Sequence, residues 1–106
     1  MIVFQVVLGV VYAIVGIAKL AGAKPLAEQF EEFGLGLTVM RIVGALEVAA
    51  AVGLFIDGLD TLAAVGMVAM MIGALGYHRR VGHAAADSTP AIVVLVASLV
   101  YAALSV

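Results

Sequence analysis

The stretch TVMRIVGALEVAAAVGLFI, residues 38–56, decides what kind of fold this chain adopts. At about 1.5 Å per residue, a helix of this length crosses most of the ~30 Å apolar core of a bilayer. Glu47 lies near its middle. A carboxylate at the bilayer centre costs about 2.5–3.5 kcal/mol on insertion scales. We therefore expect Glu47 to have a partner, a bound proton or a functional role.

The composition agrees with lipid as the solvent. The 106 residues are 66% hydrophobic and 11% charged, whereas soluble domains are about 25% charged. The apolar runs are continuous and do not alternate with polar residues, which favours helices over a β-barrel. Five Lys and Arg residues in a chain of net charge −2 leave no basic patch for nucleic acid. The absence of cysteine excludes disulfides, thiolate metal sites and a thiol redox relay.

Four apolar runs predict four spans, at residues 1–20, 38–56, 61–77 and 91–106. The first run precedes small residues that resemble a signal-peptide cleavage site, but it lacks a basic start and is long, so we interpret it as a retained helix. Asp57 and Gly58 predict a tight turn and hence antiparallel neighbours. Residues 78–89 read as a polar loop, with Pro90 in the first turn of the last helix. The predicted fold is an all-α, integral membrane four-helix bundle forming a single domain, residues 1–106.

Residues 24–37 have a different pattern. Leu26, Phe30 and Phe33 recur at helical spacing, while glutamates and Gln29 occupy the other face. This predicts a short amphipathic helix between spans one and two, at the membrane surface or capping the bundle. A structured loop packed on the helix ends is the alternative. All five Lys and Arg residues lie at or near the first and third loops, so the positive-inside rule places these loops in the cytoplasm.

Each predicted span gathers its small and polar residues on one face, which we expect to turn inward because lipid offers polar groups no partner. In the third span this face holds Gly66, Met70, Gly73 and Tyr77. The helical rise per residue gives the depth of each residue below the cytoplasmic end of its helix. On this estimate four residues share one layer in the interior, where Tyr12 or Ser98 can bond the Glu47 carboxyl. Four more form a second layer near the cytoplasmic end of the bundle. The first layer is Tyr12, Glu47, Met70 and Ser98, and the second is Lys19, Arg41, Tyr77 and His78.

Several of these residues also have plain structural interpretations. Lys19 and Arg41 near helix ends are typical snorkelling anchors, and Arg79 with Arg80 is typical of a topology signal. The Met and Gly stripe of the third span is typical of helix packing. His78 and His83 are a poor ligand pair for a metal or haem, so no metal site is predicted. Glu47 differs, because an intramembrane acid is functional by default and burial favours its protonated form.

Three motifs resemble the DoxX-like family of small bacterial membrane proteins. They are Gly16-Ile17-Ala18-Lys19-Leu20, Phe30-Glu31-Glu32-Phe33-Gly34 and Gly44-Ala45-Leu46-Glu47, and the segment from Met70 to His78 is also similar to the family pattern. The resemblance implies a four-helix bundle in the bacterial cytoplasmic (inner) membrane. It implies a subunit of a quinone-linked oxidoreductase, such as thiosulfate:quinone oxidoreductase, or a partner in a membrane redox complex. It also points to Lys19, Glu47 and His78 as the polar positions of interest.

Three functions remain open at this stage. The first is a redox-complex subunit whose inward cluster binds a quinone-like ligand or relays a proton, with Glu47 and Lys19 as the catalytic candidates. The remaining candidates, taken as ligand-binding, are Tyr12, Arg41, Met70, Tyr77, His78 and Ser98. The second is a non-catalytic assembly protein that uses the small residues Ala45, Ala49 and Gly53 to bind partner subunits or a second copy in a homo-oligomer. This function predicts no cavity around Glu47 and a carboxyl closed off by Lys19, Arg41 or Tyr12. The third is a small proton-coupled exporter.

Overall fold

The computed structural model describes residues 2–80 and 85–106, with side chains described outside 85–89. This part of the chain forms five helices and no strand, which confirms the all-α prediction. The helices are α1 (Ile2–Leu20), α2 (Lys24–Glu32), α3 (Leu37–Gly53), α4 (Asp60–Arg80) and α5 (Ala85–Ser105).

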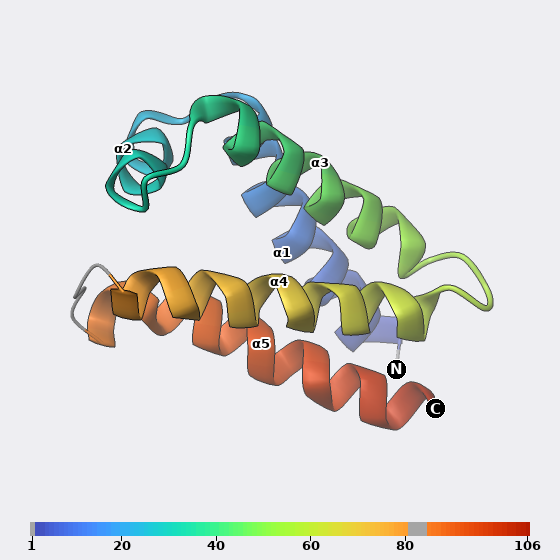
Figure 1. Ribbon diagram of the computed structural model, residues 1–106. Helices are drawn as coiled ribbons and strands as arrows, with labels where there is room; N and C mark the ends of the chain where they lie inside the picture. The colour runs from blue at the N-terminus through green and yellow to red at the C-terminus, as the bar shows by residue number, and fades with distance from the viewer. Residues whose placement is uncertain (1, 81–84) are drawn as a thin grey trace.

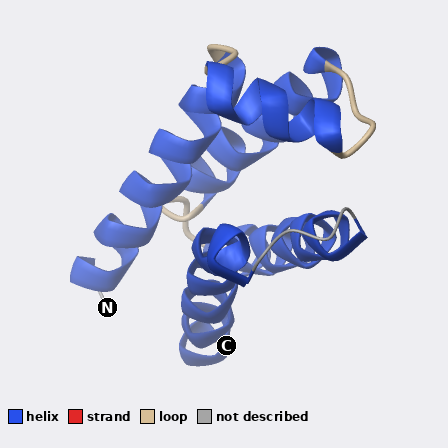
Figure 2. Ribbon diagram, turned by 90° about the vertical axis from the view of Figure 1, so that its left-hand side faces the viewer, coloured by secondary structure: helices blue, strands red, loops and turns tan. Residues whose placement is uncertain are grey.

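The helices are arranged as two pairs with α2 at one end. Helix α1 packs along α3, and α4 packs along α5. The two pairs come together at the turn between α3 and α4 and separate toward α2, which lies at their open end (Figure 1). Figure 2, turned by 90°, shows the α1–α3 pair set apart from the α4–α5 pair. Both termini lie at the end opposite α2 (Figure 1).

The described helices contain two segments of spanning length and a third that is bent. Helices α1 and α4 are long and apolar enough to cross a membrane. Helices α2 and α3 pass the same criteria only together, as one segment bent by 115°. The apolar part of α5, Pro90–Ser105, is shorter. By length and composition, two of the described helices could cross a membrane, or three segments if the bent pair counts as one, whereas the sequence predicted four spans.

Glycines end α1 and α2 and let the chain reverse direction. Gly22 has φ 72° and Gly34 has φ 78°, a left-handed conformation that costs glycine little. After α2, the Leu35 N–H donates to the Phe30 carbonyl at 2.8 Å and the Gly34 N–H to that of Glu31 at 3.0 Å. This bond pattern caps a helix C-terminus. The predicted amphipathic helix is thus present, and it ends at Glu32, just before Gly34.

Two predicted boundaries were wrong. Helix α3 ends at Gly53, and residues 54–59 turn with bonds such as Phe55 N–H to the Val52 carbonyl, so the apolar run to residue 56 is not all helical. The polar loop predicted over residues 78–89 is shorter, because α4 continues to Arg80 and α5 begins at Ala85. Cations in the last turn of α4 complement the helix dipole, so the charge taken as a loop signal also suits a helix end. His83 lies outside the described residues.

Candidate functional site

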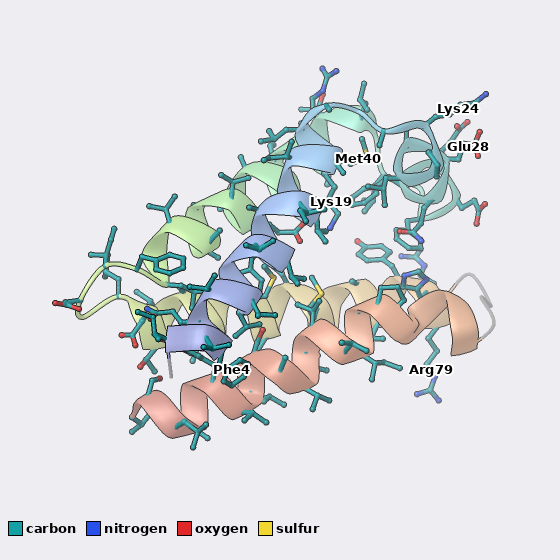
Figure 3. The ribbon with its side chains drawn as sticks, turned by 180° about the vertical axis from the view of Figure 1, so that it is seen from behind. Phe4, Lys19, Lys24, Glu28, Met40 and Arg79 are labelled. Atoms are coloured by element: carbon teal, nitrogen blue, oxygen red, sulfur yellow. The ribbon has the colours of Figure 1, made fainter. Side chains whose placement is uncertain are left out.

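The close crossing of α1 and α3 brings together the two charged side chains of the site. Gly16 and Gly44 lie at the crossing, and Lys19 and Glu47 each follow three residues later, on the same helix face. The Lys19 Nζ donates a hydrogen bond to Glu47 Oε1 in a buried ion pair. Glu47 is 1% exposed and Lys19 is 8% exposed. Figure 3 shows Lys19 projecting into the interior, while Lys24, Glu28 and Arg79 project outward.

A cavity of about 150 Å³ adjoins this ion pair, between the two helix pairs. Its apolar wall includes Met67 and Met71 from α4. Its polar lining comes from four helices and consists of Tyr12, Lys19, Gln29, Glu47 and His78. Such an apolar pocket with a few convergent polar groups is the usual form of a small-molecule site.

Tyr12 and Ser98 join the α1–α3 pair to α5. Their hydroxyls share a hydrogen bond, and both residues are fully buried. The sequence predicted that one of them would bond the Glu47 carboxyl, whereas the structure gives that place to Lys19. Lys19 was expected in the layer near the cytoplasmic end of the bundle, but its long side chain reaches Glu47 in the deeper layer. Tyr12 still lines the same cavity as Glu47.

A second cavity, of about 230 Å³, lies beneath α2 and is lined by aromatic rings. Phe33 stacks on Tyr77 with ring centroids 5.5 Å apart and meets His78 edge-on at 5.1 Å. Phe30 lies with its ring centroid 5.9 Å from the Lys19 Nζ, within reach of a cation–π attraction. Lys19, Gln29, Met71 and Ala74 line both cavities, so Lys19 lies at their common wall, whereas Glu47 lines only the first cavity.

The third-span stripe does not face the buried core. That face of α4 carries Ala64, Met67, Met71 and His78. The predicted stripe of Gly66, Met70, Gly73 and Tyr77 instead lines the cavities between α3 and α4. Met70 is thus separated from the cavity that Tyr12 and Glu47 line. Gly66 and Gly73 have no side chain, so they leave space beside α4 that a larger residue would fill.

Arg41 lies apart from the other candidates. It is exposed, and its guanidinium lies near Gly22, where an added Cβ would be 3.6 Å from Nη2. It does not line the cavities around Lys19. This position agrees with an interfacial anchor, one of the two interpretations open from the sequence.

Sequence reasoning did not identify four residues that the structure places at the site. Gln29 was assigned to the polar outer face of the amphipathic helix, but it is half-buried and lines both cavities. Phe30 and Phe33 were treated only as an apolar face. Met67, four residues before Met71 on the buried face of α4, was also overlooked. The i, i+4 methionine spacing was the available signal.

The buried polar groups are satisfied by one another. Among the described residues, no buried side-chain nitrogen or oxygen lacks a hydrogen-bond partner. Within the same residues no group of three or more His, Cys, Asp or Glu is arranged to hold a metal ion. An ammonium carries three N–H donors and a carboxylate offers about four acceptor positions. The Lys19–Glu47 bond uses part of this capacity, and the remainder is available to a polar ligand at the cavity wall.

Comparison with known proteins gives one match. The sequence model of the DoxX-like family matches residues 3–101, nearly the whole described chain. A search of curated proteins and a search of solved structures found no match.

Proposed function

We propose, from the premise that the chain belongs to the DoxX-like family, that it is a membrane subunit holding a quinone-like ligand between its helix pairs. Family membership and the apolar helices make it a membrane protein. In this proposal residues 1–106 form one domain with four crossings, the last through Pro90–Ser105. The domain lies in the bacterial cytoplasmic membrane, with the first and third loops on the cytoplasmic side.

The buried Lys19–Glu47 pair carries this proposal, because both residues line the first cavity and Lys19 also lines the aromatic cavity beneath α2. Replacing a buried ion pair by apolar residues is often neutral or stabilising. Stability alone therefore does not account for charges kept here, whereas ligand binding does. A quinone combines a flat ring, which suits the aromatic lining beneath α2, with carbonyl oxygens that accept hydrogen bonds.

Each polar residue has a defined part in the proposed site. The Lys19 ammonium donates to a quinone carbonyl while it remains paired with Glu47. Glu47 holds the ammonium in place and can pass on one of the two protons that the ring takes up when partner subunits reduce it to the quinol. Tyr12 and His78, which line the same cavity, are the next groups in a proton path. Redox partner subunits would supply the electrons, since the chain has no cysteine and no complete catalytic set.

Equilibrium binding in lipid nanodiscs tests the proposal. The probe is a dimethoxy-methyl-1,4-benzoquinone carrying a decyl tail. A hydrogen bond from a charged donor contributes about 1.5–3 kcal/mol, so Lys19→Met should weaken binding about tenfold or more. Because this change leaves Glu47 unpaired, Lys19→Met/Glu47→Leu serves as a second variant that keeps the interior neutral.

Arg79→Gln is the matched control, since Arg79 is an exposed cation on α4. It should bind as the wild type does. Unchanged binding in the folded double variant, or no binding by the wild type, would exclude the proposed ligand site.

A structural assembly role is the second candidate, favoured by the closure of the Glu47 carboxyl by Lys19. Ala45 and Ala49 are exposed on α3 and suit close packing against another helix. This function predicts that Ala45→Leu, at a residue that lines none of the cavities, disrupts a complex with partner subunits or with a second copy, whereas the Lys19→Met/Glu47→Leu variant still assembles. Co-purification of tagged variants from the native membrane separates the two functions.

A further inference from the structure

A third cavity, lined only by apolar side chains, lies between α3 and α4. Its volume is about 460 Å³, and it begins at the turn between these helices. It is lined by Leu46, Ala49, Ala50, Gly53, Leu59, Leu62, Ala63, Gly66 and Met70. We call it the α3–α4 groove.

The α3–α4 groove lies next to the aromatic cavity beneath α2. Met70 lines both, so its side chain separates the two spaces. On α3, Val39 and Val43 line the aromatic cavity, and Leu46 and Ala50 continue along the same face into the groove. On α4, Tyr77 and Gly73 lead in the same way to Met70 and Gly66. The two spaces therefore lie end to end along the facing surfaces of α3 and α4, with Met70 between them.

Polarity changes along this path in the order that a membrane amphiphile requires. Lys19, Gln29 and the aromatic rings lie at the α2 end, and the wholly apolar groove extends from Met70 toward the turn between α3 and α4. From Leu62 to Met70 the groove extends about 12 Å along α4, close to half of the ~30 Å apolar core. An amphiphile in a leaflet likewise has its polar head near the surface and its tail toward and beyond the midplane.

We propose that the α3–α4 groove holds the apolar tail of the ligand whose head lies beside Lys19, and that Met70 is the positioning residue between head and tail. This inference rests on the proposed function and adds the ligand class, a ring compound with a long apolar tail. The small residues Ala49, Gly53 and Gly66 leave the depth that the tail occupies. The tail moves into the groove from lipid and not from water, so only packing contributes to its binding free energy. We therefore expect the tail to increase the affinity modestly.

Gly66→Phe tests the groove without disturbing the site of the head. A Cβ on Gly66 meets no atom within 4 Å, so the ring can enter the groove without displacing backbone. The control is Gly76→Phe, on the same helix, where a Cβ also meets nothing within 4 Å. Gly76 is exposed and lines none of the three cavities.

The measurement is binding in nanodiscs of the same benzoquinone with and without its decyl tail. Gly66→Phe should weaken binding of the tailed compound by about three- to tenfold, a packing effect, and leave the tail-less compound unchanged. Gly76→Phe should change neither. In one outcome, Gly66→Phe still binds the tailed compound more tightly than the tail-less one to the same degree as the wild type, while Lys19→Met/Glu47→Leu binds both compounds more weakly. This outcome would support the proposed site of the head and exclude the groove as the site of the tail.

Photolabelling provides a readout that does not depend on affinity. A diazirine at the end of the decyl tail should label peptides of α3 and α4 around Leu46 and Leu62. Labelling confined to α1 and α5 would overturn the inference. So would labelling of the groove by a diazirine phospholipid that the tailed quinone does not displace, because the occupant would then be bulk lipid.

Discussion

Gly16 and Gly44 touch through their backbones where α1 crosses α3. A Cβ on Gly44 would lie 2.6 Å from the Gly16 carbonyl oxygen and 2.8 Å from the Lys19 Cβ. Small residues allow this approach in lipid, where packing and not the hydrophobic effect drives helix association. The contact lies one turn from Lys19 and Glu47, so it sets the distance at which their side chains meet.

Gly44→Ala should therefore force α1 and α3 apart and weaken the ion pair. The new methyl group meets backbone atoms that cannot rotate away, so we expect destabilisation of about 1–3 kcal/mol. Denaturation in detergent micelles, followed by helical circular dichroism, measures the change.

Gly76→Ala is the control for this prediction. Its Cβ meets nothing within 4 Å, so the higher helix propensity of alanine should stabilise the fold by up to about 1 kcal/mol. Equal effects of the two substitutions would show that the α1–α3 contact is looser than described here.

The Lys19–Glu47 pair should behave asymmetrically when its members are removed singly or together. Lys19→Met leaves a buried unpaired carboxyl, and we expect a loss of about 3–5 kcal/mol, less if the carboxyl takes up a proton. Lys19→Met/Glu47→Leu removes both charges and should recover most of that loss. Unfolding of the three proteins under one set of conditions tests this, and a double variant no more stable than Lys19→Met would contradict a buried pair.

The hydrogen bond between Tyr12 and Ser98 links α1 to α5. Hydrogen bonds between membrane helices are worth about 0.6 kcal/mol on average and up to about 1.7 kcal/mol. A double-mutant cycle of Tyr12→Phe and Ser98→Ala should therefore give a coupling energy in this range. A coupling indistinguishable from zero would mean that the two hydroxyls do not bond.

Phe33 holds α2 against the end of α4. Its ring contacts Tyr77 and His78, and each aromatic contact is worth about 0.5–1.5 kcal/mol. Phe33→Ala should raise hydrogen exchange in residues 24–36 while leaving α1 protected. Tyr77→Phe keeps the stacked ring and should exchange as the wild type does. Unchanged exchange in Phe33→Ala would mean that other contacts fix α2.

Hydrophobic periodicity predicted the helical segments well. The continuous apolar runs indicated α1, α3, α4 and α5, and the spacing of Leu26, Phe30 and Phe33 indicated α2. The inward faces of α1 and α3 were also predicted correctly, because Tyr12, Lys19 and Glu47 are buried. These features depend on local sequence, and lipid strongly penalises an outward polar group.

Features that depend on how helices meet could not be predicted in the same way. On α4, two neighbouring faces both carry methionine and small residues, and only the angle between the helix pairs decides which one is buried. The depth estimate placed Lys19 and Glu47 in different layers, although Lys19 was one of the partners named under the assembly hypothesis. Such an estimate measures backbone height, whereas a lysine side chain reaches several ångströms along the helix. Gln29 was assigned to the outer face because the helical pattern does not reveal a cavity beneath it.

Density in an experimental structure of the protein in lipid nanodiscs, saturated with the decyl benzoquinone, tests the central claim most directly. The account predicts a ring bounded by Phe30, Phe33 and Tyr77, with a carbonyl oxygen within hydrogen-bond distance of the Lys19 Nζ and the tail passing Met70. A map with the helix pairs closed on each other and the quinone only on the outer surface would contradict it.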